Sequence, residues 1–126
     1  MIDELITEVK DAIGADVGNR VYAVVAPVNV VFPCVVIDIT KTDPYHTKTS
    51  TTRKETEVMV TIMAKESSAI DSAFAIAYDL GVILVSTINS QIVSGTEYRV
   101  MDIVTDYEDE VGVYKTMVSL LIQGDF

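Results

Sequence analysis

The chain has 126 residues, which is the size of one domain with a single core and too short for two. Hydrophobic residues make up 49% of it and charged residues 22%, a balance that predicts a folded rather than a disordered protein. With 19 acidic residues against 9 basic ones, the formal net charge is -10. Such a protein has no general affinity for nucleic-acid phosphates, which attract Lys and Arg, although it could lie close to DNA without retaining it.

No segment marks the chain for export or for a membrane. The start, MIDELITEVK, is acidic and amphipathic and lacks the basic residues and apolar run of a secretory signal. The apolar stretch at residues 21–37 is rich in Val and broken by Pro27 and Pro33, so it predicts strands rather than a membrane helix. Cys34 is the only cysteine, which excludes an internal disulfide and makes a reducing compartment the simplest setting.

The first third of the chain predicts a helix and two strands. Over residues 2–13, apolar side chains recur at helical spacing and two acidic residues in the first turn complement the helix dipole. A short strand is expected at residues 20–25, followed by an irregular crossing. Pro33 can open a strand but cannot lie in its middle, so the next strand is predicted from Pro33 to Thr40 or Lys41.

Residues 42–53, TDPYHTKTSTTR, are rich in hydroxyls and offer no apolar face, so we expect an exposed loop. Loops of this length in a compact domain are usually functional or disordered. Residues 54–65 then alternate strictly and predict a strand. Its inward face is expected to carry Thr56, Val58, Val60, Ile62 and Ala64.

A long helix is predicted over residues 67–92, begun by a capping box of Ser68 and Asp71 and stopped by Gly95. Gly81 weakens a helix by about 1 kcal/mol relative to Ala, which is tolerable if something must approach the backbone closely there. The core-facing positions are predicted to be Ile70, Ala73, Phe74, Ala77, Gly81, Leu84 and Ile88. Ile76, Leu80 and Ile83 form a second apolar strip, so the helix should be covered on more than one side.

Two further strands, at residues 97–107 and 112–123, are predicted to form an antiparallel hairpin around an acidic turn at residues 108–111. The whole chain is therefore expected to be a single α+β domain of order α-β-β-β-α-β-β, with two helices on one face of a mainly antiparallel sheet of four to five strands. The second hairpin strand should turn Tyr114, Thr116, Val118, Leu120 and Ile122 toward the helices.

The other face of this sheet is not fully polar. Alternation places on it Met59, Met63, Val100, Val104, Met117 and Leu121, mixed with Asp38, Glu55, Glu57, Asp102 and Lys115. An exposed apolar patch of this kind usually means that a partner covers it.

No constellation of residues predicts catalysis, a cofactor or a metal. His46 is the only histidine, and no motif pairs it with a nucleophile; Cys34 reads as a small core hydrophobe. The acidic run from Asp102 to Glu110 lacks the spacing and the glycine of a calcium loop, so a solvated hairpin tip is favoured. We therefore expect a protein that is not an enzyme and carries no cofactor.

Basic groups concentrate in and beside the 42–53 loop of this acidic chain. They are Lys41, Lys48, Arg53 and Lys54. One interpretation is a solvated loop. The other is an arm that docks on an acidic surface of another copy, such as the hairpin tip of Glu108, Asp109 and Glu110. Such docking would need apolar burial as well, because surface ion pairs contribute little.

Taken together, the order of segments resembles the small tail-completion or tail-terminator proteins of long-tailed bacteriophages and prophages. The resemblance lies in the N-terminal helix, RVYAVVAPVNVVFPCVVIDI, the loop leading into KETEVMVTIMA, the helix AIDSAFAIAYDLGVIL, and the strands YRVMDIVTDYED and VYKTMVSLLIQG. It implies a structural virion protein that forms a homo-oligomeric ring, commonly of six copies, at the end of the tail tube. Such a ring stops tube growth and presents a surface to the head-side connector.

Several expectations follow from this resemblance. The protein would be assembled in the bacterial cytoplasm and end in the virion tail, in contact with the major tail tube protein, with DNA passing through the ring without specific binding. The lumen side is expected to carry Glu55, Glu57 and Asp102. Two alternatives stay open: a head-to-tail connector, or a regulatory α+β domain with a small-ligand site between helix and sheet.

Overall fold

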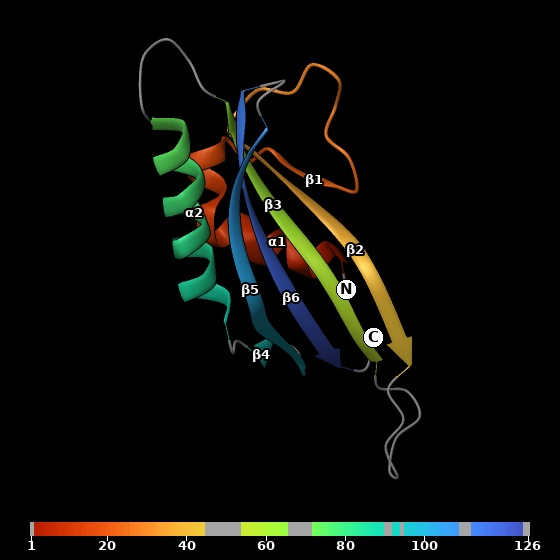
Figure 1. Cartoon of the computed structure of the whole chain (residues 1–126). Helices are drawn as coiled ribbons and strands as arrows, with labels where there is room; N and C mark the ends of the chain where they lie inside the picture. The colour runs from red at the N-terminus through yellow and green to blue at the C-terminus, as the bar shows by residue number, and fades with distance from the viewer. Residues whose placement is uncertain are drawn as a thin grey trace.

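The computed structural model describes residues 2–44, 54–65, 72–89, 92–93, 95–108 and 112–124 (Figure 1). The helical elements are α1 (Ile2–Ile13), the 3-10 turn η1 (Gly14–Val17) and α2 (Ser72–Ile88). The strands are β1 (Val21–Ala23), β2 (Cys34–Pro44), β3 (Lys54–Lys65), β4 (Ile92–Val93), β5 (Thr96–Glu108) and β6 (Val113–Gly124).

One sheet joins all the described strands in the order β1-β2-β3-β6-β5-β4. The β1–β2 pair is parallel and every other neighbouring pair is antiparallel. The α+β class and the mainly antiparallel sheet are thus confirmed, and so is the hairpin of β5 and β6. The sheet has more strands than expected because the two-residue β4 pairs with the start of β5.

Both helices cover one face of the sheet, and the core lies between them and the strands. Leu5, Val9 and Ile13 of α1 follow each other at intervals of four residues and are fully buried against this face. The predicted inward rows are confirmed: those of β3 and β6 are buried apart from Tyr114, which is partly buried. Alternation in these two strands therefore predicted the core correctly.

Tyr98 of β5 is the largest fully buried side chain in this core. Burial away from water raises its pKa to about 12, and the nearby carboxylates of Glu4 and Glu8 add to this shift. Its hydroxyl and the hydroxyl of Thr56 are buried without a hydrogen-bond partner among the described atoms. A buried hydroxyl that lacks a hydrogen-bond partner offsets part of the stability gained by burying the rest of its side chain.

Helix α2 ends at Ile88, four residues before the predicted end, and this prediction was wrong. The chain leaves the helix at Asn89, whose side-chain Oδ1 accepts a hydrogen bond from the backbone N–H of Val100 at 3.1 Å. It then reverses through β4 into β5. Gly95, with φ of +81°, lies in the turn between these strands rather than at the helix end. The predicted capping residues at the start of the helix fall outside the described residues.

Gly81 explains how closely α2 approaches the sheet. A Cβ atom at this position would lie 2.5 Å from Cγ2 of Thr116 on β6 and 3.3 Å from Cδ1 of Ile103 on β5. The backbone of α2 can therefore rest directly on the sheet only because residue 81 has no side chain. The sequence-based expectation of a close approach at this glycine is confirmed.

Strand β2 continues to Pro44, past its predicted end at Thr40 or Lys41. A bulge between Ile39 and Lys41 interrupts its pairing with β3, after which the register resumes to Pro44 opposite Lys54. Backbone pairing does not need an apolar face, so the polar composition of this segment did not end the strand. The first strand is shorter than expected, and residues 45–53 of the predicted loop lie outside the described residues.

Candidate assembly surfaces

None of the described helices covers the face of the sheet opposite α1 and α2, and we call it the open face. The strand registers place on it Val36, Asp38, Glu55, Glu57, Met59, Thr61, Met63, Lys65, Glu97, Arg99, Asp102, Val104, Lys115, Met117, Ser119 and Leu121. This face thus mixes apolar and charged side chains, as alternation predicted.

The residues predicted to contact another subunit through this face all point onto it. Met59, Met63, Met117 and Leu121 are partly buried there by their neighbours in the sheet. Val100 was placed wrongly: a bulge between Val100 and Asp102 shifts the alternation, so Val100 packs on the helix side against the core. The predicted lumen residues Glu55, Glu57 and Asp102 share the open face with the methionines.

Charge and apolarity are sorted along the open face. A row of side chains crosses the strands through Val36, Thr61, Met117 and Val104, and it is apolar except for Thr61; Met63 lies in the next row. The end of the face toward the C-terminus of β6 is acidic, since Asp38, Glu55, Glu57, Glu97 and Asp102 gather there around Arg99. A neighbour that covered this row would therefore leave a cluster of carboxylates beside it.

The predicted basic arm and its acidic target are only partly described. Lys54 begins β3 and Lys41 pairs with Glu57 in the register, while Lys48, Arg53, Asp109 and Glu110 lie outside the described residues. Glu108 forms an ion pair with Lys115 of its own chain. Docking of the arm on the hairpin tip stays a prediction, with a target carboxylate that already has a partner.

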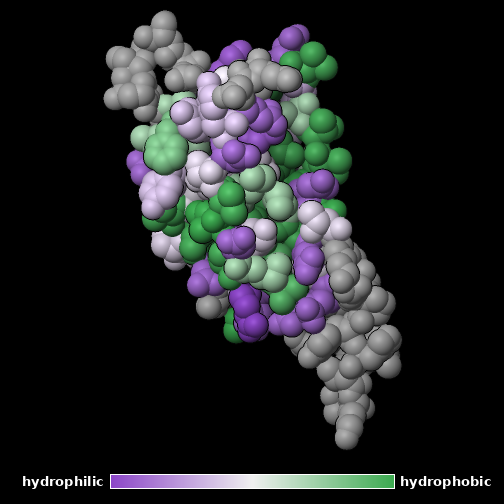
Figure 2. Space-filling model, viewed as in Figure 1, coloured by the Kyte–Doolittle hydropathy of each residue, from purple (hydrophilic) through white to green (hydrophobic). Residues whose placement is uncertain are grey.

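A loop between β1 and β2, residues 24–31, exposes four valines, and we call it the valine loop. They are Val24, Val25, Val28 and Val31, and Val28 is 100% exposed. Green side chains mark this loop along the right-hand side of Figure 2. A hollow of about 570 Å³ beside it is lined by Val28 of the loop, by Phe32 directly after the loop, and by Met63 and Lys115 of the open face. The valine loop therefore lies on the open-face side of the sheet.

The backbone of the valine loop is strained at its start. Val24 has φ of +72°, and the N–H of Val25 donates a 2.9 Å hydrogen bond to the carbonyl of Ala23, which closes a three-residue turn. A positive φ is rare for a β-branched residue and costs on the order of 1–3 kcal/mol. The N–H of Val24 donates to the carbonyl of Ile37 at 2.7 Å and holds the turn on the sheet. These two hydrogen bonds therefore fix the start of the valine loop to the sheet.

A second apolar surface, which we call the aromatic patch, lies on the helix side. It consists of Phe74, Tyr78 and Val82 on one flank of α2, Ile103 and Tyr107 on β5, and Tyr114 on β6. The Phe74 ring stacks on Tyr78 with centroids 5.9 Å apart and meets Tyr114 edge-on at 5.6 Å. Phe74 and Tyr78 remain 49% and 47% exposed, so the prediction that Phe74 faces the core was wrong. Figure 2 shows apolar side chains gathered over the strands beside α2.

Neither surface was identified from the sequence. The sequence predicts a crossing between strands at the valine-rich segment, and the run of valines around Pro27 is the signal in it that points to an exposed apolar surface. The spacing of Phe74, Tyr78 and Val82 at intervals of four residues was visible too. It was assigned in part to the core because the helix is apolar on nearly every side.

The free edge of β5 is closed to strand addition at several points. Its backbone N–H groups at Val100, Ile103 and Tyr107 donate to the side chains of Asn89, Asp102 and Asp106 respectively, at 3.1, 2.9 and 2.8 Å. The bulge at Met101 bends the edge as well. Bulges and charged side chains are the means by which proteins prevent edge-to-edge pairing. Contacts at this edge are therefore expected to use side chains rather than an added strand.

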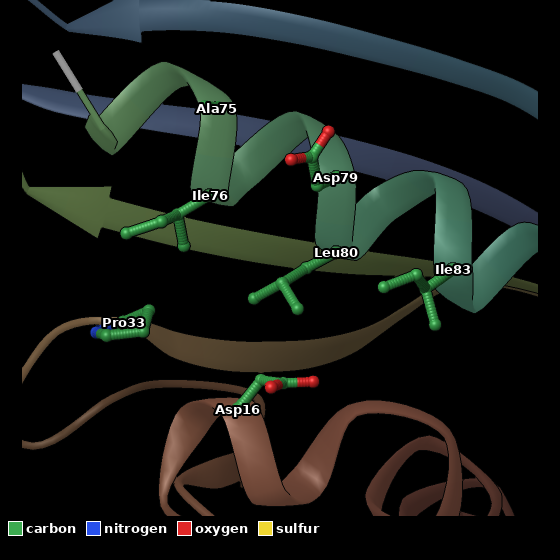
Figure 3. Close-up of a pocket in the computed structure, with 7 residues that line it drawn as sticks. All are labelled: Asp16, Pro33, Ala75, Ile76, Asp79, Leu80 and Ile83. Carbon is green, nitrogen blue, oxygen red and sulfur yellow. The ribbon is translucent and has the colours of Figure 1, made fainter.

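A groove of about 400 Å³ separates α2 from η1 and the start of β2 (Figure 3). Ile76, Leu80 and Ile83 point from α2 into the groove, toward the side that carries Pro33 and Asp16, while Asp79 points away from it. This is the second apolar strip of the helix, and it is covered only in part. Asp16 and Asp79 are both exposed, so the groove lacks the buried, convergent polar groups of a typical small-ligand site.

The described residues include no group of three or more His, Cys, Asp or Glu side chains that could hold a metal ion. Cys34 is fully buried, and this burial raises the pKa of its thiol despite the opposing effect of Arg20. A thiol in that environment is a poor nucleophile. His46 lies outside the described residues. Within the described part of the chain, no helix is long and apolar enough to cross a bilayer.

Comparison with known proteins gives a likeness of fold. No protein-family model matches the sequence, and no curated protein matches it either. Among solved structures, the chain is similar to a chain of the "Virion of native gene transfer agent (GTA) particle", with a TM-score of 0.68 and 11% sequence identity. The match covers 96% of this chain and 92% of the other. At this identity the likeness shows that the two chains share a fold over nearly their whole length.

Proposed function

We propose that this protein is a structural virion protein that forms a ring at the head-proximal end of a phage tail tube. In this role it ends tail polymerisation and provides the joining surface for the head connector. The observation that carries the proposal is the presence of apolar surfaces on both sides of the sheet, the open face with its valine loop on one side and the aromatic patch on the other. The shared fold with a chain of a gene transfer agent virion supports it.

Two unlike surfaces on opposite sides of one subunit favour head-to-tail contacts. Such contacts are heterologous, and they close into a ring when the rotation per subunit allows it. A ring of six copies, assembled in the bacterial cytoplasm, is the form expected of this class. The acidic end of the open face, with Glu55, Glu57 and Asp102, would then line the lumen and let DNA pass without being held.

The test is to add the purified protein to tail tubes grown from the tail tube protein of the same phage and to examine them by electron microscopy. We expect one ring at one end of each tube and a narrow distribution of tube lengths. A protein that leaves tube length unchanged and binds only purified connector would instead be the head-to-tail adaptor. A protein that binds neither would overturn the virion assignment.

The groove beside α2 is the place to test the ligand-binding alternative. A regulatory domain would keep a small fixed stoichiometry with and without tubes, and its stability would rise with a small molecule bound between Ile76 and Pro33. Thermal unfolding across a panel of metabolites, together with mass photometry, separates this outcome from ring assembly.

A further inference from the structure

The two exposed apolar surfaces of this chain differ in shape and lie on opposite faces of the sheet. The valine loop projects on the open-face side, where Val28 lines the hollow together with Met63 and Lys115. The aromatic patch lies on the helix side, where Phe74 meets Tyr114. One surface is a narrow projection and the other a broader set of rings.

We infer that the valine loop of one copy docks on the aromatic patch of the next copy. This inference rests on the proposed ring and specifies its subunit contact. Because the two surfaces face in opposite directions, the contact is heterologous, and each copy has one loop to donate and one patch to offer. The same contact repeated around an axis closes a ring without any further type of interface.

Charge supports a second copy as the occupant. Residues 17–37, which include the valine loop, contain no Asp or Glu in a chain with a net charge of -10. The edge of β5 beside the aromatic patch carries Asp102 and Asp106, whose side chains lie on the open-face side and accept hydrogen bonds from the N–H groups of Ile103 and Tyr107. Residues 17–37 of a neighbouring copy can approach these carboxylates without charge repulsion. Acidic parts of the neighbour's surface would be repelled by them.

The backbone of the loop supports the same conclusion. Val24 is held at φ of +72° and is 68% exposed, so no packing of its own side chain explains the strained turn. Strained backbone positions cluster at functional sites, which is consistent with a loop that contacts a partner. A loop that is already shaped loses less conformational entropy on docking.

The edge of β5 limits how the contact forms. With its N–H groups at Val100, Ile103 and Tyr107 bonded to side chains, this part of β5 is not free to pair with a strand of the neighbour. The contact is therefore expected to rest on side-chain burial, with the valines inserted among the rings of Phe74 and Tyr78.

The first experiment compares Val28→Asp, Val28→Lys and a matched control, Ile92→Asp, by mass photometry and sedimentation, alone and with tail tubes. Val28 and Ile92 are both exposed, so none of these changes should prevent folding. Loss of one buried valine predicts that half-assembly needs a concentration about tenfold higher, with Val28→Asp weaker than Val28→Lys because of the carboxylates of Asp102 and Asp106 beside the patch. Ile92→Asp, which is outside both surfaces, should assemble as the wild type does.

The second experiment joins the two surfaces covalently in a Val28→Cys, Tyr78→Cys double variant under mild oxidation. These positions lie on opposite faces of one chain, too far apart for an internal disulfide. A heterologous contact predicts a ladder of linked copies that stops at the ring size, while either single variant gives none. Cys34 is buried and should stay unreacted.

The outcomes separate this inference from the proposed function. If Val28→Asp still forms rings but no longer caps tubes, the loop contacts the tube, and the inferred subunit contact is wrong although the terminator role stands. If the double variant gives only dimers, the contact is isologous and the inference also fails. If the wild type neither assembles nor caps tubes, the proposed function itself is overturned.

Discussion

Replacing Gly81 with Ala tests the close approach of α2 to the sheet, which sets the position of the aromatic patch. The new Cβ would lie 2.5 Å from Cγ2 of Thr116, about 1 Å inside ordinary van der Waals contact. Thr116 cannot easily turn away, because its hydroxyl is hydrogen-bonded to the hydroxyl of Thr105 at 3.0 Å. Overpacking of this kind costs about 1–3 kcal/mol, while Ala gains about 1 kcal/mol over Gly in a helix. We expect a net loss of roughly 1 kcal/mol, and at most about 2 kcal/mol, in the free energy of unfolding.

Urea unfolding followed by circular dichroism measures this loss, and Thr116→Ser supplies the decisive comparison. Serine keeps the hydroxyl and removes the clashing methyl, so Gly81→Ala in this background should stabilise the protein by up to about 1 kcal/mol. The coupling energy between the two sites is therefore expected to be on the order of 1–3 kcal/mol. Ser86→Ala, on the exposed side of the same helix, is the matched control and should change stability by only a few tenths of a kcal/mol. If Gly81→Ala stabilises the wild-type protein, the helix does not rest on Thr116 as described.

Three further predictions concern the core and the edge of the sheet. Because the pKa of Tyr98 is raised to about 12 in the folded protein, its stabilising effect should be complete below pH 10. This effect should then fall by roughly 2–3 kcal/mol as the pH rises from about 10 to 12, as measured by urea unfolding of the wild type and of Tyr98→Phe, whose pH dependence is subtracted because it comes from the other titrating groups. Thr56→Val should raise the unfolding free energy by about 1 kcal/mol, because it removes a buried hydroxyl that has no partner among the described atoms; a loss of stability would indicate a hydrogen bond to water there. Replacing Asp102 and Asp106 with Ala should speed aggregation, seen by light scattering, while Asn at both positions should preserve the protection; equal aggregation of both variants with the wild type would show that the edge needs no capping.

The sequence predicts correctly those elements in which apolar residues recur at a single regular spacing and all face the same side of the core. The strand at residues 54–65 alternates without interruption, and its inward row is buried as expected. Helix α1 has a single apolar stripe and was predicted with its observed bounds. In both elements, local spacing alone decides which side chains meet the core.

The predictions failed where the face that a residue occupies depends on how neighbouring elements pair and pack, and not on local spacing alone. The bulge at Met101 has no signature in the sequence, yet it reverses the face of every residue before it, and so Val100 lies on the opposite side from its prediction. Helix α2 is apolar on nearly all sides, so spacing could not tell which flank extends past the edge of β5 and leaves Phe74 exposed. The candidate surfaces lie in these places, which is why sequence reasoning found the open face and missed the valine loop and the aromatic patch.

The distribution of charge bears on how an acidic protein could assemble with itself. Copies with a net charge of -10 repel one another, and surface ion pairs alone would not offset that repulsion. Assembly therefore requires apolar burial at surfaces where carboxylates are absent or already engaged, as Glu108 is by Lys115 and Asp106 by the N–H of Tyr107. Both conditions are met at the valine loop and the aromatic patch, whereas the acidic end of the open face gathers several carboxylates, of which Asp102 is engaged by the N–H of Ile103 and Glu97 by Arg99. If the copies assemble through the first two surfaces, the acidic end stays outside the contact, as the proposed lumen role of Glu55, Glu57 and Asp102 requires.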